Sequence, residues 1–224
     1  MSPNRILSHL APADFSLLQP HLQAVELPLR RELEMRNKRI GYVYFIESGF
    51  ASVVANGSTK PGIEIGIIGR EGMTGSSVVL ASNDRAAHDT YIQLAGNGQR
   101  LRVANLREAI MQSVDLHHVL LRYVRSFLLQ TASTALANGR STIEERLARW
   151  LLVAQDRLDG DQVPLTHEFL SVMLGVRRPG VTIALQALER DGLIAHRRGV
   201  ITILYRKGLE AHSNGIYVPL SDNY

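Results

Sequence analysis

The sequence predicts an α+β protein with an N-terminal antiparallel β-roll (jelly-roll-like), a long central helix and a C-terminal winged helix-turn-helix. Three observations predict this order. Short apolar runs between turn residues fill 27–103, a helical repeat of apolar residues covers 113–137, and 165–203 has the pattern of two short helices followed by a hairpin. Its 224 residues are enough for two ordinary domains. The expected bounds are 1–112 for the β-roll, 113–138 for the central helix and 139–224 for the winged helix-turn-helix domain.

The expected strands are short and rich in β-branched and aromatic residues. Residues 42–46 form a buried strand, and 50–55 form its neighbour, closed by Asn56-Gly57, a dipeptide suited to a type I′ hairpin turn. Residues 69–75 are too rich in glycine for a helix or strand and form a loop. A helix is expected before the roll at 12–22, and further strands at 63–68, 90–95 and 100–103.

The central helix is apolar on two faces. One stripe alternates spacings of three and four, as in the seam of a two-stranded coiled coil. Such a helix has more surface to bury than one β-roll covers, which favours a dimer; the alternative is an amphipathic helix that covers its own domain. A hinge is expected at 138–141. The predicted seam consists of Leu121, Val124, Leu128, Thr131 and Ala135.

Local signals mark each end of the C-terminal helices. Thr142 and Glu145 have the spacing of a capping box. Thr166 is suited to cap a first short helix, and Gly175 to end it in a left-handed conformation. Pro179 fits the first turn of a second helix, where its missing N–H would be unpaired anyway.

Positive charge is concentrated in this segment. Between residues 177 and 207 seven Lys or Arg face two acids, a net charge of +5 that exceeds the +4 of the whole chain. A winged helix-turn-helix with such a charge predicts binding to double-stranded DNA. The basic residues are Arg177, Arg178, Arg190, Arg197, Arg198, Arg206 and Lys207.

The composition excludes several classes of site. The chain has no cysteine, which rules out disulfides, thiolate metal sites and iron–sulfur clusters and fits a cytoplasmic location. No apolar run is long enough to span a bilayer, and no membrane partner is expected. A metal-dependent enzyme on a β-roll needs converging histidines, whereas 27–103 contains only His88. Phosphate-loop, dinucleotide and nucleophile-elbow motifs are also missing, so no enzyme, metal or cofactor is expected.

The order of elements resembles the CRP/FNR superfamily of bacterial transcription regulators. The resemblance covers nearly the whole chain and is strongest over 145–203, which includes the run L-G-V-R-R-x-x-V-x-x-A-L-x-x-L-x-x-x-G-L-I at 174–194. It implies a homodimer, an effector-sensing β-roll, a two-fold symmetric operator and, for an activator, contact with RNA polymerase.

The residues at the implied effector pocket depart from those of cyclic-AMP-binding members. The glycine–glutamate pair that holds the ribose corresponds to the Gly69–Gly72 stretch, and the arginine–serine pair that binds the phosphate to His88 and Asp89. Asp89 repels a phosphate, so cyclic AMP is disfavoured unless Arg85 substitutes through a shifted loop. Thr131 falls where the helix touches the base, but threonine is also ordinary seam packing. The candidate pocket residues are Glu71, Gly72, Arg85, His88, Asp89 and Thr131.

The resemblance also assigns roles at the DNA. Arg178 matches an arginine that reaches guanine, whereas Pro179 and Ile183 replace two other base-reading residues, so the operator should differ from that of cyclic-AMP members. Thr182 and Gln186 lie on the exposed face of the second helix. Phosphate contacts are expected from Arg177, Thr166, His167, Arg197 and Arg198.

Two other interpretations remain at this level. Arg177 and Arg178 would be solvated surface residues in a chain that does not bind DNA. A non-enzymatic adaptor or RNA-binding protein could use the same winged-helix scaffold without specific DNA contacts.

Overall fold

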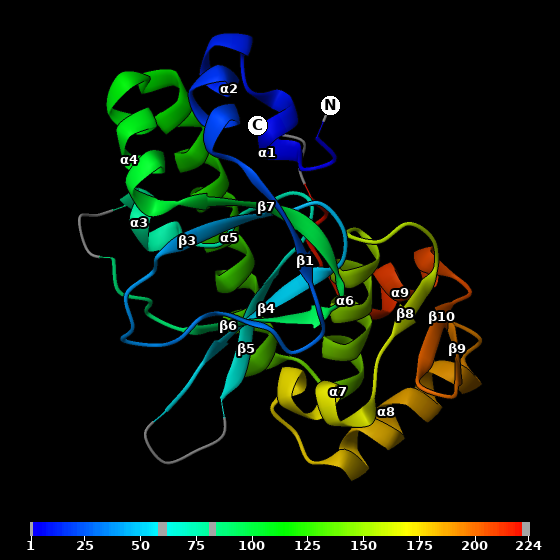
Figure 1. Cartoon of the computed structure of the whole chain (residues 1–224). Helices are drawn as coiled ribbons and strands as arrows, with labels where there is room; N and C mark the ends of the chain where they lie inside the picture. The colour runs from blue at the N-terminus through cyan, green and yellow to red at the C-terminus, as the bar shows by residue number, and fades with distance from the viewer. Residues whose placement is uncertain (1, 58–61, 81–83, 221–224) are drawn as a thin grey trace. The chain divides into compact units, whose positions relative to one another are not determined.

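The computed structural model describes residues 2–57, 62–80 and 84–220, except the side chain of His167. The chain divides into two compact units. Within the described residues, the first unit comprises 2–55 and 66–129, and the second comprises 56–57, 62–65 and 130–220. The elements of both units are labelled in Figure 1.

The N-terminal segment forms more elements than the sequence predicted. Helix α1 (Arg5–His9) is capped by Asn4, whose Oδ1 accepts a hydrogen bond from the Leu7 N–H. The Asn4 side-chain amide also donates to the carbonyls of Ile46 and Gly72, both at 2.8 Å. The expected helix 12–22 is divided into α2 (Pro12–Leu18) and a 3₁₀ turn η1 (Gln19–His21). Pro20 explains the break, because it has no N–H to continue an α-helix.

The strands of the first unit form the expected roll, with two edge strands that the sequence did not indicate. The orders are β1–β7–β3 and β2–β6–β4–β5, and the pairs β1–β7, β3–β7, β2–β6 and β4–β6 are antiparallel. The β4–β5 connection spans 56–62, so the expected two-residue turn at Asn56-Gly57 is wrong. The strand bounds are β1 Gln23–Leu27, β2 Glu32–Glu34, β3 Tyr42–Ile46, β4 Phe50–Ala55, β5 Ile63–Ile68, β6 Asp89–Leu94 and β7 Gly96–Arg102.

Two shorter helices accompany the roll. Helix α3 (Ser76–Leu80) follows the glycine-rich loop, and α4 (Val103–Gln112) begins directly after β7 and lies beside α2 (Figure 1). The buried core of the unit joins the roll to these helices and to the first part of α5, including Phe45, Leu101 and Leu116. Neither short helix was predicted, and the expected strand at 100–103 overlaps the first residue of α4.

The long helix α5 runs from Val114 to Arg140, beyond the expected end. Asn138 and Gly139 therefore lie inside the helix and are not a hinge. One glycine costs a helix only about 1 kcal/mol, which the neighbouring turns offset. The chain instead breaks at Ser141 and Thr142, where the capping box with Glu145 begins the next helix, as predicted.

The predicted seam of α5 needs a correction. Val124 is 3% exposed and belongs to the core of the first unit, so it is not available to a partner. Leu128 is 57% exposed, whereas Leu121 is half-buried against the same core. Leu129 and Leu136, which the seam did not include, are 54% and 55% exposed. The open apolar side of α5 is therefore displaced toward Leu129 and Leu136.

The second unit contains the predicted winged helix-turn-helix. Strands β8, β10 and β9 form an antiparallel sheet in that order, and α6 packs on both α8 and α9. The bounds are α6 Ile143–Gln155, β8 Gln162–Pro164, α7 His167–Leu174, α8 Arg178–Arg190, β9 Ile194–Arg197, β10 Val200–Ile203 and α9 Arg206–His212.

Burial lowers the pKa of Arg149 on α6 to about 10, so the side chain stays charged at neutral pH. Its guanidinium donates hydrogen bonds to the Gln130 carbonyl, Thr134 Oγ1 and the Ile216 carbonyl.

Candidate DNA-binding surface

The turn between α7 and α8 is built by the residues that the sequence singled out. Thr166 caps α7, its hydroxyl oxygen accepting a hydrogen bond from the Phe169 N–H at 3.4 Å. Gly175 ends α7 with φ +61°, a left-handed conformation that glycine adopts without strain. Arg177 is the N-cap residue of α8, and Pro179 lies in its first turn. The turn therefore places Arg177 and Arg178 at the N-terminus of α8.

The side chains of α8 that were predicted to face DNA differ in their exposure to solvent. Arg177, Arg178 and Gln186 are exposed. Thr182 is half-buried, and its hydroxyl donates to the Arg178 carbonyl at 3.2 Å. Ile183 is 62% exposed and was not among the predicted contacts. The inward side chains Val181, Ala184, Leu185 and Leu188 anchor α8 and leave this face outward.

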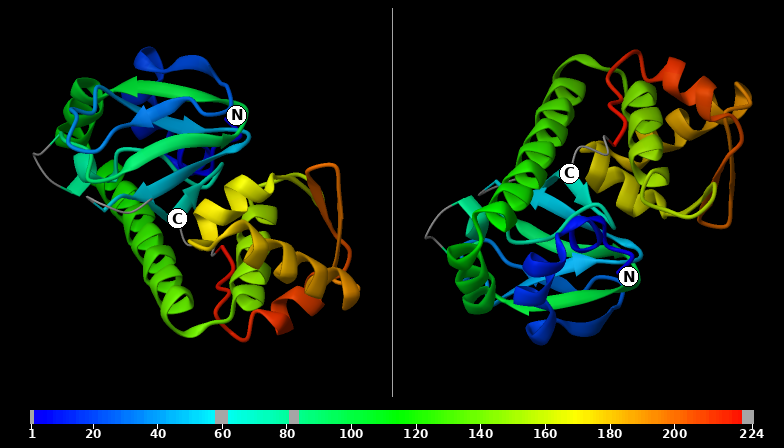
Figure 2. Two further views of the ribbon diagram at one scale, coloured as in Figure 1. Left: turned by 90° about the horizontal axis from the view of Figure 1, so that it is seen from below. Right: turned by 90° about the horizontal axis from the view of Figure 1, so that it is seen from above.

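The hairpin of β9 and β10 carries two further arginines at its tip. Arg197 ends β9, and Arg198 and Gly199 connect it to β10 with φ +50° and +77°. Positive φ at both central residues is the geometry of a type I′ turn, which follows the twist of the strands. Both arginines are exposed, and Figure 2 shows the hairpin beside α8. Thr166 is exposed, whereas the side chain of His167 lies outside the described residues.

Arg206 was counted in the predicted basic surface, but its side chain is bound within the second unit. Its guanidinium donates to Gln155 Oε1 at 2.7 Å, to Asp156 Oδ1 at 2.8 Å and to Glu210 Oε1 at 3.0 Å. It also donates to the Tyr217 hydroxyl at 2.6 Å, which in turn donates to Asp156 Oδ2 at 2.7 Å. Arg206 therefore joins α6, α9 and the C-terminal segment, and its charge is balanced within the unit. Sequence counting could not distinguish it from the exposed arginines.

The predicted effector residues of the roll are engaged with the protein itself. Glu71 is 3% exposed, and both carboxylate oxygens accept from the Gly69 N–H, at 3.1 and 3.2 Å. A Cβ at Gly72 would come within 2.5 Å of the Tyr123 ring, whose hydroxyl donates to the Met73 carbonyl. These residues hold the loop 69–75 against α5.

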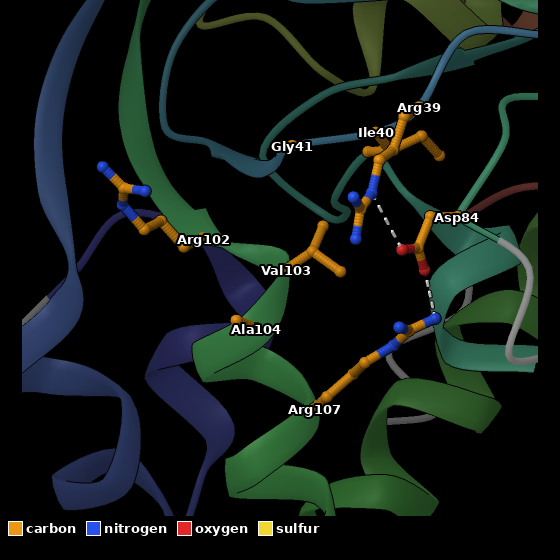
Figure 3. Close-up of a pocket in the computed structure, with 8 residues that line it drawn as sticks. All are labelled: Arg39, Ile40, Gly41, Asp84, Arg102, Val103, Ala104 and Arg107. Atoms are coloured by element: carbon orange, nitrogen blue, oxygen red, sulfur yellow. Dashed lines mark hydrogen bonds and ion pairs between the residues drawn. The ribbon is translucent and has the colours of Figure 1, made fainter.

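The other candidates differ in burial and in their hydrogen-bond partners. Asp89 Oδ1 accepts from the Arg36 N–H at 2.7 Å, and Arg85 is exposed and donates to the Asn37 carbonyl. His88 is half-buried; burial first and the nearby Arg36 second lower its pKa, against a smaller opposite effect of Asp89. Thr131 belongs to the second unit. A described cavity of the first unit, shown in Figure 3, is lined by none of these six residues.

The helix-turn-helix region of the chain matches a known domain family. Residues 145–212 match the model of the Crp-like helix-turn-helix domain. The second unit contains a Crp-like helix-turn-helix domain, and the chain has the fold of CRP/FNR-family structures. The match covers most of α6, the α7–α8 motif, the β9–β10 hairpin and α9, which are the elements that position the exposed arginines.

Solved structures with the same fold extend over both units. FixK2 from Bradyrhizobium japonicum is 18% identical with a TM-score of 0.74, covering 89% of this chain and 99% of its own. A CRP/FNR-family transcriptional regulator from Eubacterium rectale is 17% identical with a TM-score of 0.71, covering 94% and 98%. A CRP-family regulator from Thermus thermophilus is 18% identical with a TM-score of 0.70, covering 88% and 99%. No curated protein matched the sequence.

Two further properties concern the described residues alone. None of the described helices combines the length and the hydropathy needed to cross a membrane. No group of three or more His, Asp or Glu side chains in residues 2–57, 62–80 and 84–220 is arranged to hold a metal ion.

Proposed function

We propose that this CRP/FNR-type chain is a transcription regulator that binds a two-fold symmetric DNA operator as a homodimer. The observation that carries the proposal is the pair Arg177 and Arg178, exposed at the start of α8 inside a Crp-like helix-turn-helix domain. In helix-turn-helix proteins the second helix enters the major groove with its N-terminal residues against the base edges.

The contacts divide into those that select sequence and those that anchor the protein. Arg178 would make bidentate hydrogen bonds to guanine, and Gln186 would reach a second base on the same face of α8. Ile183, exposed beside Gln186, offers an aliphatic surface to a thymine methyl group. Arg177, Thr166, His167, Arg197 and Arg198 would contact phosphates, which set position and affinity more than sequence.

The homodimer is supported by the open apolar side of α5. Leu128, Leu129 and Leu136 are each more than half exposed on one helix. Pairing two such helices removes these side chains from water at a gain of roughly 25 cal/mol per Å² of buried apolar surface. The pairing would also present two copies of α8 to successive major grooves.

The β-roll would hold a small effector, but not cyclic AMP in the usual manner. At the predicted phosphate position Asp89 is an acceptor that already bonds the backbone of residue 36, and the carboxylate of Glu71 is buried. If the regulator activates transcription, RNA polymerase would be a further partner. The cytoplasm is the compartment in which these partners would be met.

The test is a gel shift with the DNA upstream of the chain's own gene. We expect a retarded complex that survives competitor RNA and random DNA. Arg178→Ala should lose about 1–3 kcal/mol of preference for the specific site while keeping salt-sensitive binding. Arg197→Ala is the matched variant, because losing a phosphate contact should weaken all DNA sequences equally.

The adaptor or RNA-binding alternative predicts a different pattern. Competitor RNA would then remove the complex as well as specific DNA does, and Arg178→Ala and Arg197→Ala would behave alike. Either result would overturn the assignment of Arg178 as a base-reading residue.

A further inference from the structure

A cavity with a positive lining lies in the first unit, and none of the predicted effector residues lines it. It has a volume of about 350 Å³, is partly open to solvent, and is lined mainly by residues before β3, at the end of β7 and at the start of α4. Its lining residues are Arg39, Ile40, Gly41, Asp84, Arg102, Val103, Ala104 and Arg107. Cavities that hold small metabolites begin at about 300 Å³.

Asp84 organises one wall of this cavity. Its Oδ2 accepts a hydrogen bond from Arg39 Nε at 3.3 Å, and its Oδ1 forms an ion pair with Arg107 Nη2. Figure 3 shows the carboxylate between the two guanidinium groups. The Asp84 side chain is 14% exposed, and its backbone carbonyl accepts from the Ile40 N–H at 2.6 Å, so the carboxylate is held in place.

The guanidinium of Arg39 has more hydrogen-bond donors than its bond to Asp84 uses. Each guanidinium carries five N–H donors in a planar fork. The Arg39 side chain is 82% exposed, and Arg107 is 34% exposed, so both still reach solvent while they bond Asp84. A planar carboxylate or a phosphate is the group that such forks bind best.

Arg102 adds a third positive charge on the opposite wall. Its guanidinium lies over the Tyr42 ring at 5.4 Å, and it forms no ion pair with any described residue. Figure 3 shows its side chain running away from Asp84. Because the residue is exposed and an exposed cation–π contact is worth only about 0.5–1 kcal/mol, a ligand can draw it toward the cavity. Three arginines against one aspartate leave the lining positive.

We infer that this cavity binds a small metabolite that carries a phosphate or a carboxylate group. The anionic group would lie against the exposed guanidinium of Arg39, and Arg102 would close over it. The negative charge of Asp84 is already paired with Arg39 and Arg107, so it opposes the anion less than an unpaired carboxylate would. The space beside the lining residue Gly41 is open, because a Cβ there would meet nothing within 4 Å. The cavity is lined by none of the six effector residues predicted in the roll, although Asp84 directly precedes Arg85 in the chain.

Calorimetric titrations of the full chain at constant ionic strength test this inference. The probes are inorganic phosphate, glycerol 3-phosphate and succinate, which separate phosphate from carboxylate recognition. We expect saturable binding of at least one probe, with a dissociation constant of about 1 mM or below. Arg39→Gln should weaken it about tenfold, the loss of one charge-assisted pair. The double substitution of Arg39 and Arg102 by Gln should remove saturation.

Arg100→Gln is the matched control. Arg100 also lies over the Tyr42 ring, at 4.8 Å, but does not line the cavity. Its substitution removes one positive charge from the same region and should change the binding of the probe less than twofold. The inference is overturned if no probe saturates up to about 20 mM, or if Arg100→Gln weakens binding as much as Arg39→Gln. DNA is not part of this measurement, so its outcome is independent of the operator proposal.

Discussion

Arg178 at the start of α8 forms an ion pair with Glu168 in the first turn of α7. Arg178 Nη2 lies 3.6 Å from Glu168 Oε2, and the two side chains are 68% and 63% exposed. Exposed pairs of this kind contribute about 0.2–1 kcal/mol, because water screens the charges and holding two long side chains costs entropy. Arg178 can therefore leave Glu168 for a guanine at small cost.

Removing this competitor should strengthen DNA binding. We expect Glu168→Gln to raise affinity about two- to fivefold, the equivalent of one exposed ion pair. Fluorescence anisotropy with labelled operator DNA measures the change. Asp191→Asn is the matched control, because Asp191 is an exposed acid that pairs with Arg190 at 3.3 Å and not with Arg178. If both substitutions give the same gain, the gain reflects total charge and not the release of Arg178.

The proposed dimer makes a second prediction on α5. Leu128→Glu places a charge on the open apolar side, where burying it in a helix pair would be unfavourable. We expect monomers in light scattering and a large loss of operator affinity. Met111→Glu on α4 is the control, because Met111 is 80% exposed but lies outside α5. A dimer that persists in Leu128→Glu would contradict the proposed interface.

The sequence predicted the helix-turn-helix more closely than any other part. Thr166, Gly175 and Pro179 act through their own backbone and their neighbours within one turn, so local chemistry decides where α7 ends and α8 begins. Strands β1 and β2 were missed because they are short and largely exposed, and therefore lack an apolar pattern. Their pairing depends on β7 and β6, which are distant in sequence.

The errors on α5 and in the roll have a tertiary origin. A heptad-like pattern cannot decide which of two apolar faces the domain itself covers, so Val124 was assigned to the seam and Leu129 and Leu136 were left out. Charge counting likewise cannot tell that Arg206 is bound by Asp156 and Glu210. Asp89 was recognised as unsuited to a phosphate, but its bond to the backbone of residue 36 required the fold.

The network around Arg206 should contribute to the stability of the second unit. In Tyr217→Phe the hydroxyl that bonds both Arg206 and Asp156 is lost. Burial first, and the bond to Asp156 second, raise the pKa of Tyr217, so the hydroxyl is protonated at neutral pH. We expect a loss of about 1–3 kcal/mol in the free energy of unfolding, measured in urea. Tyr205→Phe, at a residue 56% exposed, should change it by less than about 0.5 kcal/mol.

Glu34 should give the unfolding free energy a specific pH dependence. Burial raises its pKa, against smaller opposing effects of hydrogen bonds from Thr90, the Gly75 backbone and Thr74. The Thr90 hydroxyl donates to Glu34 Oε2 at 2.9 Å. Because the raised pKa means that the folded state binds the proton more tightly than the unfolded state, this residue's contribution falls as pH rises from the unfolded to the folded pKa.

The substitution Glu34→Gln isolates that contribution, because glutamine resembles the protonated acid. Below the unfolded pKa the carboxyl is neutral in both states, and variant and wild type should have similar unfolding free energies. As pH rises the variant should become the more stable protein, and the difference should level off above the folded pKa. Urea unfolding between about pH 4 and pH 8 measures it. Glu32→Gln, at the exposed start of β2, should show no such trend; a parallel trend there would mean that general charge, and not the buried carboxylate, causes it.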